Sequence, residues 1–281
     1  MFKGFYNLTS GMLTQGRHLD ILSNNIANIP TSGFKGDRFT ASTFQEVMWS
    51  RVGNMVKHYE DIGEQSWITA PSQMYTDFTQ GTLDQTFLPL DFAINGEGWF
   101  AIENLNPDQD LNPYDDPEAE DNPENPEEAE NPGNEERRIE YTRSGSFALD
   151  NEGYLVLPGQ GYVLDINRER IRLVTDKLHD DGYGGLFTEA GGYLGRIGIF
   201  VFEDNEAQLE KNNQGLFVSE AEPQVTTTPL INGYLERSNV DWVKNMTEMI
   251  SAQRAYQSMA ELTQIYDTVM NRITQEVGRL S

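Results

Sequence analysis

The sequence contains no cysteine and few basic residues. The lack of cysteine excludes disulfide frameworks, thiolate zinc sites and cysteine nucleophiles. Lysine and arginine total 20 against 45 aspartates and glutamates, which gives a formal net charge of −25. Nucleic-acid binding needs a basic patch that this chain does not supply, and an anionic lipid surface would repel it. Nucleic acid is therefore not an expected partner.

Long apolar runs are also missing. No stretch of about 18 apolar residues occurs, so the sequence predicts no membrane insertion. The segment Met1–Leu8 carries one lysine followed by glycine and polar residues, without the continuous apolar core of a secretory signal. If the protein leaves the cytoplasm, we expect a route that uses no cleaved signal peptide.

Signals for catalysis are sparse. The histidines are His18, His58 and His179; none has a partner at metal-ligand spacing, and no serine lies in a Gly-x-Ser-x-Gly elbow. His18 falls in a helical pattern, whereas His58 and His179 lie in stretches typical of a linker or loop. Pairs of acidic residues carry no information about function. Among 45 aspartates and glutamates, some pair will resemble the two catalytic carboxylates of a glycosidase by chance. We expect no enzyme activity and no cofactor.

About half of the net negative charge comes from one segment, 104–136. It holds thirteen acidic residues, no basic ones and six of the twelve prolines. Asp108 and Asp110 match the first positions of an EF-hand loop, but Pro113 and Ala119 occupy the positions that require glycine and glutamate. The segment therefore predicts a disordered, solvated insertion and no calcium site.

Apolar residues recur at alternating steps of three and four at both ends of the chain, which is the seam of a coiled coil. The N-terminal seam comprises Phe5, Leu8, Met12, Gln15, Leu19, Leu22, Ile26 and Ile29. The C-terminal seam comprises Met249, Ala252, Tyr256, Met259, Thr263, Tyr266, Met270, Ile273, Val277 and Leu280. An ordinary amphipathic helix on a globular core explains one such seam. Two seams at opposite ends favour helices that pack against each other and against copies of the chain.

Residues that start and stop helices flank these seams. Pro30 and Gly33 predict the end of the first helix, and Ser238 with Asp241 predicts a capping box before the second. Three asparagines, Asn24, Asn25 and Asn28, stand at the end of the first helix. Their amides can cap helix carbonyls or bond to an adjacent subunit.

The middle of the chain predicts short strands separated by turn residues such as Asn95-Gly96. The expected strands are Leu90–Ile94, Trp99–Ile102, Ile139–Arg143, Tyr154–Leu157, Tyr162–Asp165 and Ile197–Phe202. The predicted fold class is α+β: N- and C-terminal helices form a coiled-coil-like assembly domain, and the centre is all-β. The expected segments are an N-terminal helix and linker (1–70), a central β domain (71–225) and a C-terminal helix (226–281).

Several ordered motifs resemble bacterial flagellar rod, hook and hook-basal-body proteins. The N-terminal motif comprises Ser10, Gly11, Met12, Asp20–Asn28 and Thr31–Lys35, with Gly33, Phe34 and Lys35 at its end. The central motifs are Thr79–Gly81, Leu90–Gly96, Gly98–Phe100 and Tyr141–Gly145. The C-terminal motif comprises Gly233, Tyr234, Leu235, Glu236, Ser238, Asn239, Val240, Gln253, Arg254, Ala255 and Tyr256. The start Met1–Tyr6 looks like the Gram-positive members.

The resemblance implies a structural subunit whose terminal helices line a tube around an export channel, with the β domain outside. It implies export by the flagellar type III apparatus, and partners among copies of the chain and other axial proteins of the rod and hook. The length favours a distal or proximal rod protein over a hook subunit. The acidic insertion and Trp99, where the family usually has Phe, depart from the pattern.

The assembly residues that we predict combine the seams and the motifs. They are Leu8, Met12, Leu19, Leu22, Asn24, Asn25, Ile26, Asn28, Gly33, Phe34, Lys35, Gly233, Tyr234, Leu235, Glu236, Ser238, Asn239, Val240, Gln253, Arg254, Tyr256, Met259 and Tyr266. Two other interpretations stay open at this point: a cell-wall-associated carbohydrate-active enzyme and a secreted ligand-binding module.

Overall fold

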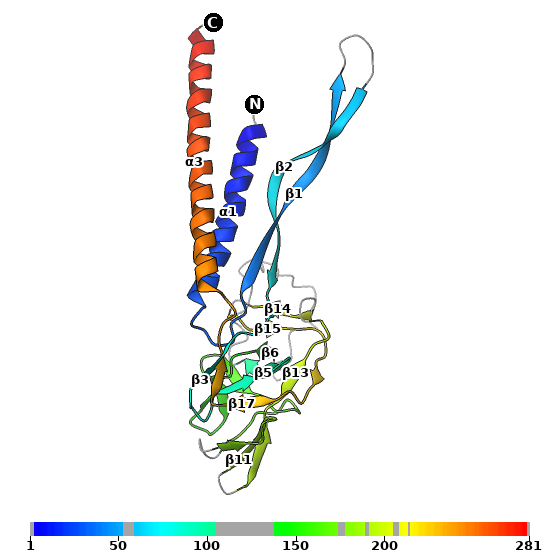
Figure 1. Ribbon diagram of the computed structural model, residues 1–281, viewed down its shortest axis with the longest axis vertical. Coiled ribbons are helices and arrows are strands. Elements are labelled where there is room, and N and C mark those ends of the chain that lie inside the picture. The colour runs from blue at the N-terminus through cyan, green and yellow to red at the C-terminus, as the bar shows by residue number, and fades with distance from the viewer. Residues whose placement is uncertain are drawn as a thin grey trace, which may run out of the picture. The chain divides into compact units, whose positions relative to one another are not determined.

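The computed structural model describes residues 3–52, 59–104, 138–173, 178–188, 191–204, 208–212 and 214–279 (Figure 1). The chain forms two compact units. The helical unit comprises Met1–Ile29, Lys35–Asp77 and Val240–Ser281, and the β unit comprises Pro30–Phe34 and Phe78–Asn239. The predicted acidic insertion, 104–136, lies outside the described residues apart from Asn104, as do His58 and Leu280.

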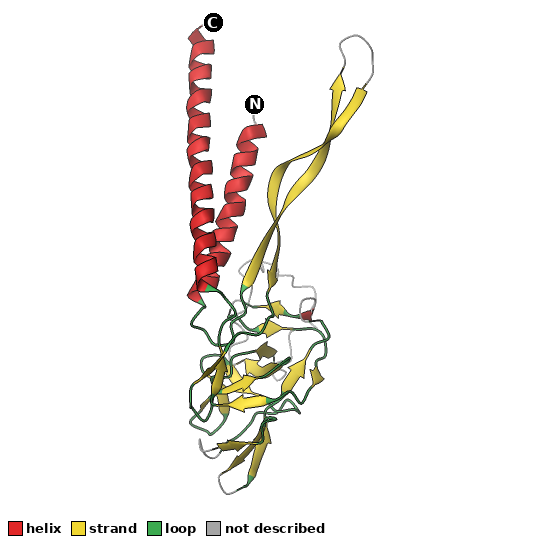
Figure 2. Cartoon of the chain, viewed as in Figure 1, coloured by secondary structure: helices red, strands yellow, loops and turns green. Residues whose placement is uncertain are grey.

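Two long helices come from the two ends of the chain (Figure 2). Helix α1 spans Lys3–Ala27 and α3 spans Trp242–Arg279. They pack side by side in the helical unit and run antiparallel, since Phe5 near the start of α1 lies beside Tyr266 in the second half of α3. The seams predict this pairing of the helices; a coiled-coil supercoil remains a prediction.

Local residues set the helix ends. The last turn of α1 closes with the Asn28 amide donating to the Asn24 carbonyl at 3.1 Å, before Pro30 removes a backbone donor. Helix α3 starts after Asp241, whose carboxylate accepts the Lys244 amide at 3.0 Å. The N-cap is therefore Asp241 itself. The predicted capping box that began at Ser238 was wrong by three residues, because the side chain that reaches an N3 amide belongs to Asp241.

A long β-hairpin follows α1 in the helical unit. Strand β1 (Asp37–Val52) pairs antiparallel with β2 (Tyr59–Thr76), from Asp37 opposite Thr76 to Val52 opposite Tyr59. The hairpin lies against α1, where His18 stacks on Phe39 with ring centroids 5.2 Å apart. The prediction of a linker up to residue 70 is therefore wrong, because these residues pair as strands. The predicted domain boundaries otherwise stay predictions.

The β unit contains short strands, most of them antiparallel neighbours in the sheets of Figure 1. The strands are β3 Leu83–Gln85, β4 Phe92–Ile94, β5 Trp99–Asn104, β6 Ile139–Thr142, β7 Ala148–Leu149, β8 Leu155–Leu157, β9 Gly161–Val163, β10 Leu178–Asp180, β11 Gly185–Thr188, β12 Tyr193–Arg196, β13 Ile199–Val201, β14 Glu210–Lys211, β15 Phe217–Val218, β16 Gln224–Val225, β17 Leu230–Asn232 and β18 Tyr234–Glu236. The six strands predicted from sequence each overlap one of these. His179 lies in β10 and not in a loop.

The largest sheet has the order β14-β15-β6-β5-β9-β8-β7, with β13 also pairing β5. Smaller sheets join β10-β11-β12, β17-β4 and β18-β3. The last two matter for the site. Strand β18, which carries part of the C-terminal motif, pairs with β3, which follows the central motif Thr79–Gly81. Strand β17, just before the C-terminal motif, pairs with β4 inside the central motif Leu90–Gly96.

Two apolar clusters form the core of the β unit. One surrounds Phe92, Phe100 and Leu155, and the other surrounds Trp99, Phe200 and Phe217. Strand β5 contributes side chains to both clusters, because alternate residues of a strand point to opposite faces of the sheet. Trp99 is 1 % exposed, so it is a core residue, and the bulk of the indole is accommodated inside the unit.

Candidate assembly surface and signature cluster

The predicted seams meet where α1 and α3 pack together. The rings of Phe5 and Tyr266 lie 6.5 Å apart, and the Thr263 hydroxyl lies 3.8 Å from the Met12 sulfur. The structure therefore places Tyr266 beside Phe5 and Met12 beside Thr263. Three further seam residues of α1, Leu8, Leu19 and Ile26, are half-buried.

Close approach of the helices depends on a small residue. A Cβ atom placed on Gly11 would lie 2.9 Å from the sulfur of Met259, so the Met259 side chain occupies the space that glycine leaves. Leu22 and Ala252 are the apolar side chains of the described parts of both helices that are fully buried. The helix pair thus has a thin core.

Four residues of the predicted C-terminal seam and motif are exposed, namely Gln253, Arg254, Tyr256 and Ile273. Tyr256 is 37 % exposed, and Gln253 and Arg254 also face solvent. Their exposed surface is available to another molecule. The predicted seam is therefore not buried along its whole length.

Helix α3 carries a second apolar stripe that α1 does not cover. Leu262, Ile265 and Val269 each lie one position before a predicted seam residue, and the steps of three and four continue to Ile273, which is itself a seam residue. Their exposed fractions are 48, 60, 48 and 42 %. Four large apolar side chains on one exposed helix face are typical of a surface that packs against another chain.

The asparagines at the end of α1 form hydrogen bonds within the chain. The Asn25 side chain is buried; it donates to the Asp37 carbonyl at 2.7 Å and accepts the Asp37 amide at 2.9 Å. Asn25 thereby fixes the first residue of β1 to the helix. The Asn28 amide group donates to the Asn24 carbonyl at 3.0 Å and caps the helix end. The capping role was anticipated, and the clamp on Asp37 was not.

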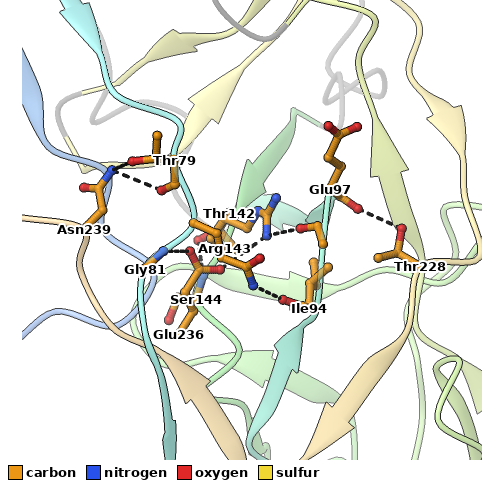
Figure 3. Close-up of polar contacts among 12 residues, drawn as sticks. Thr79, Gly81, Ile94, Glu97, Thr142, Arg143, Ser144, Thr228, Glu236 and Asn239 are labelled. Atoms are coloured by element: carbon orange, nitrogen blue, oxygen red, sulfur yellow. Dashed lines mark hydrogen bonds and ion pairs between the residues drawn. The ribbon is translucent and has the colours of Figure 1, made fainter.

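Glu236 is the centre of a buried polar cluster in the β unit (Figure 3). One carboxylate oxygen accepts the Gly81 amide at 3.0 Å, and the other lies 3.3 Å from the guanidinium of Arg143. The same Arg143 nitrogen donates to the Gly96 carbonyl at 2.8 Å. Next to them, the Gln80 amide donates to the Ile94 carbonyl at 2.7 Å. One glutamate therefore joins three chain segments.

The ion pair is almost fully removed from solvent, with side-chain exposures of 5 % for Arg143 and 0 % for Glu236. Burial lowers the pKa of Arg143, and the charge of Glu236 acts in the opposite direction. The guanidinium carbon also lies 5.2 Å from the centroid of the Trp99 ring, in a cation–π contact. Trp99 thus offers Arg143 a large aromatic face in addition to the carboxylate.

The N-terminal motif reaches the same cluster through its backbone. The Gly33 amide donates to the Glu236 carbonyl at 2.7 Å, and the Ser32 and Ser144 hydroxyls lie 2.7 Å apart. Gly33 has φ 68°, and a Cβ there would lie 2.3 Å from the Ser144 nitrogen, so only glycine fits. Phe34 is also buried and lies under Lys211, whose ammonium is 3.9 Å from the ring centroid.

The rest of the C-terminal motif fixes the strands around Glu236. Strand β18, with Tyr234 and Leu235, pairs with β3, and the Asn239 amide donates to the Thr79 carbonyl at 3.2 Å. Gly233 has φ 73° at the link between β17 and β18. Ser238 and Val240 precede α3 and are half-buried, and Lys35 is 1 % exposed.

Most motif residues are thus gathered by the structure, with the helix seams in one unit and the Glu236 cluster in the other. Sequence reasoning missed Arg143 as a site residue, although the stretch Tyr141–Gly145 belongs to a central motif. The available signal was a single arginine between buried strand residues, where a charge requires a partner. No group of metal-ligating side chains occurs among the described residues, and within them no helix is long and apolar enough to cross a membrane.

Comparison with known proteins fits this arrangement. Residues 5–35 match the family described as flagella basal body rod protein, and residues 231–276 match the C-terminal family of flagellar basal body rod FlgEFG proteins. The flagellar basal-body rod protein FlgG of Bacillus subtilis is 30 % identical over 97 % of this chain and 98 % of its own length. This chain belongs to the flagellar basal-body rod protein family.

Other relatives in the rod family span the full length of both chains. The flagellar hook-basal body complex protein FlhO of Bacillus subtilis is 29 % identical, and the rod protein FlgF of Caulobacter vibrioides is 28 % identical. The two family matches cover α1 with Gly33 to Lys35, and β18 with most of α3. They therefore fall on the helix pair and on both ends of the Glu236 cluster.

Proposed function

We propose that this rod-family protein, a structural subunit of the flagellar basal body, polymerises through α1 and α3 into a hollow axial tube. The tube would act as a drive shaft that transmits torque from the motor toward the hook. Its neighbours would be copies of itself and other axial proteins of the rod and hook. The functional residues are then those that hold subunits together, and the protein is not an enzyme.

The observation that carries this proposal is the exposed apolar stripe Leu262–Ile273 on α3. One face of α3 is occupied by α1, and this second face has no covering element in the described helical unit. On a protein that works as a monomer, such an exposed apolar stripe would promote aggregation. In a subunit of a helical array, the same stripe provides a contact with a neighbouring subunit. The exposed ring of Tyr256 gives the same helix a further contact point.

A tube requires that the two contacting surfaces of a subunit differ. A heterologous contact repeats without closing and generates a helical array, whereas a self-complementary contact stops at a dimer. We propose that the stripe on α3 packs against a different helix face of the next subunit in a coiled-coil-like manner. The exposed Leu13 (56 %) and Tyr6 (64 %) on α1 are suitable partners.

Export also fits the thin core of the helix pair. We propose that the subunit leaves the cell through the flagellar type III apparatus, without a cleaved signal peptide, and assembles outside the cytoplasm. A chain that passes through a narrow channel must unfold, and helices with little buried surface unfold readily. The polar residues Gln253 and Gln257 weaken the apolar pattern of α3 further.

The test is the variant Ile265→Asp in a strain that lacks the gene. We expect the variant to fold and be exported but to be missing from purified basal bodies, because a charge on the stripe opposes burial against a neighbour. The matched control is Thr268→Asp, which adds a charge at an exposed polar position of the same helix. Normal swimming and normal incorporation of Ile265→Asp would contradict assembly through this face.

A wall-degrading activity is the alternative for a protein that crosses the cell wall. A turnover assay of the purified protein on peptidoglycan separates the two functions. We expect no release of muropeptides above a heat-treated sample, and reproducible release would overturn the structural assignment.

A further inference from the structure

The chain contains two Asn-Gly pairs, and both lie at the same small sheet of the β unit. Asn95 follows β4 directly, and Asn232 is the last residue of β17, which pairs with β4. In an Asn-Gly pair the backbone nitrogen of glycine can attack the side-chain amide carbon of asparagine, because glycine has no Cβ that hinders the approach. The two pairs share this chemistry, but the fold places them in different surroundings.

Both reacting groups of the Asn232-Gly233 pair are hydrogen-bonded. The Gly233 amide donates to the Asp91 carbonyl at 2.8 Å. The side-chain amide of Asn232 donates to the Pro89 carbonyl at 2.8 Å. Gly233 is buried and Asn232 is half-buried. Attack by the Gly233 nitrogen would break both bonds, so the fold protects this pair from reaction.

The Asn95-Gly96 pair has neither of these bonds. Asn95 is exposed, and within the described part of the chain its side-chain amide and the Gly96 amide have no hydrogen-bond partner. Gly96 has φ 131°, and a Cβ there would lie 3.1 Å from the Thr228 methyl group, so glycine suits this position. The attacking nitrogen and the carbon that it attacks are therefore free to meet at this turn.

We propose that Asn95 is a site of spontaneous chemical modification and that Asn232 is not. The Gly96 nitrogen loses its proton and forms a bond to the side-chain carbonyl carbon of Asn95. The bond from this carbon to the side-chain nitrogen breaks and releases ammonia. Water then opens the cyclic imide at either carbonyl, which leaves aspartate or isoaspartate at position 95. The reaction proceeds in the free subunit, whatever the chain assembles with.

The isoaspartate product should loosen the buried cluster around Glu236 (Figure 3). Isoaspartate lengthens the main chain by a methylene group immediately before Gly96. The carbonyls that follow are both held in place. The Gly96 carbonyl accepts from Arg143 at 2.8 Å, and the Glu97 carbonyl accepts from the Thr228 hydroxyl at 2.8 Å. A shift of the Gly96 carbonyl would remove a hydrogen bond from a buried guanidinium, which destabilises the β unit.

The experiment compares the wild-type chain with Asn95→Gln, which keeps a side-chain amide but would have to form a larger ring to react. Both full-length proteins are incubated in mildly alkaline buffer, where the attacking nitrogen loses its proton more readily. Mass spectrometry of peptides measures conversion at Asn95 and at Asn232. Methyl transfer by an isoaspartyl methyltransferase measures isoaspartate. Wild-type chain incubated in denaturant is the control, because unfolding removes the bonds around Asn232.

We expect Asn95 to react at least about tenfold faster than Asn232 in the folded wild type, since two hydrogen bonds protect Asn232. In denaturant the two rates should become similar. Asn95→Gln should form no isoaspartate at this turn. Conversion of Asn95 should lower the melting temperature of the wild type by about 5 °C, and the same incubation should leave that of Asn95→Gln unchanged.

Equal conversion of Asn95 and Asn232 in the folded chain would overturn the proposal, as would faster conversion of Asn232. A rate difference that persists in denaturant would also overturn it, because the neighbouring sequence and not the fold would then protect Asn232. An unchanged melting temperature after isoaspartate has formed at position 95 would contradict the predicted effect on the Glu236 cluster.

Discussion

At the scale of single residues, the β unit depends on one buried ion pair. Glu236 and Arg143 are separated by 93 positions in sequence and lie together with almost no exposure to solvent. A buried pair of this kind contributes little net stability compared with apolar residues, but removal of one partner leaves the other charge buried and unpaired. The pair therefore ties the C-terminal motif to the central strands and makes the motif sensitive to substitution.

Glu236→Ala should accordingly destabilise the β unit by about 3–5 kcal/mol. For a unit of this size the melting temperature should fall on the order of 10 °C. The measurement is thermal unfolding of the purified chain. The double variant Glu236→Leu/Arg143→Met should recover part of the loss, because no charge is left unpaired.

The adjacent residue provides the control for this prediction. Arg237 pairs with Asp84 at 2.6 Å, but these side chains are 65 and 51 % exposed. Exposed pairs contribute about 0–1 kcal/mol, so Asp84→Ala should have a small effect. If Glu236→Ala were no more destabilising than Asp84→Ala, the buried pair would not have the structural role assigned to it.

At the scale of elements, helices were predictable and the hairpin was not. Steps of three and four located α1 and α3, and Asn95-Gly96 with short apolar runs located the central strands. Strands β1 and β2 were missed, although Phe39, Thr40 and Phe44 are strand-forming residues and Gly53-Asn54 is a turn signal. The strong seam beside this stretch favoured the interpretation of the segment as helix and linker.

Contacts between distant residues could not be predicted either. The seams indicated which helix faces are apolar, but not that α3 has a second, exposed apolar stripe. The Asn25 clamp on Asp37 and the Arg143–Glu236 pair arise from the path of the chain. A sequence pattern gives the periodicity of an element, whereas its partners depend on how turns direct the chain.

Two glycines of α1 give a matched test of the helix contact. A Cβ atom added at Gly16 would have no neighbouring atom within 4 Å, whereas one added at Gly11 would lie 2.9 Å from the sulfur of Met259. Alanine in a helix interior is favoured over glycine by about 1 kcal/mol. Gly16→Ala should therefore stabilise the helix pair by about that amount, and Gly11→Ala should gain less because Met259 must move.

The measurement for both glycine variants is the unfolding of the helical signal in circular dichroism. Equal gains from the two substitutions would mean that α1 and α3 do not pack closely at Gly11 in solution.

At the scale of the whole molecule, the two units differ in how much apolar surface they bury. The β unit has two core clusters with several aromatic side chains each. The described parts of α1 and α3 have Leu22 and Ala252 as their fully buried apolar side chains, and α3 leaves a stripe exposed. Local stability follows buried apolar contacts, so the units should open independently.

Hydrogen exchange of the free, full-length subunit tests this difference. We expect amides of α1 and α3 to exchange much faster than those of β5, β6 and β9, because the helix pair can open without disrupting the β core. In assembled rods the helix amides should become protected, since neighbours would cover the stripe Leu262–Ile273. A free subunit whose helices are as strongly protected as β5 would be inconsistent with helices that become stable only on assembly. Faster exchange of the helices in rods than in the free chain would contradict their position in the subunit contact.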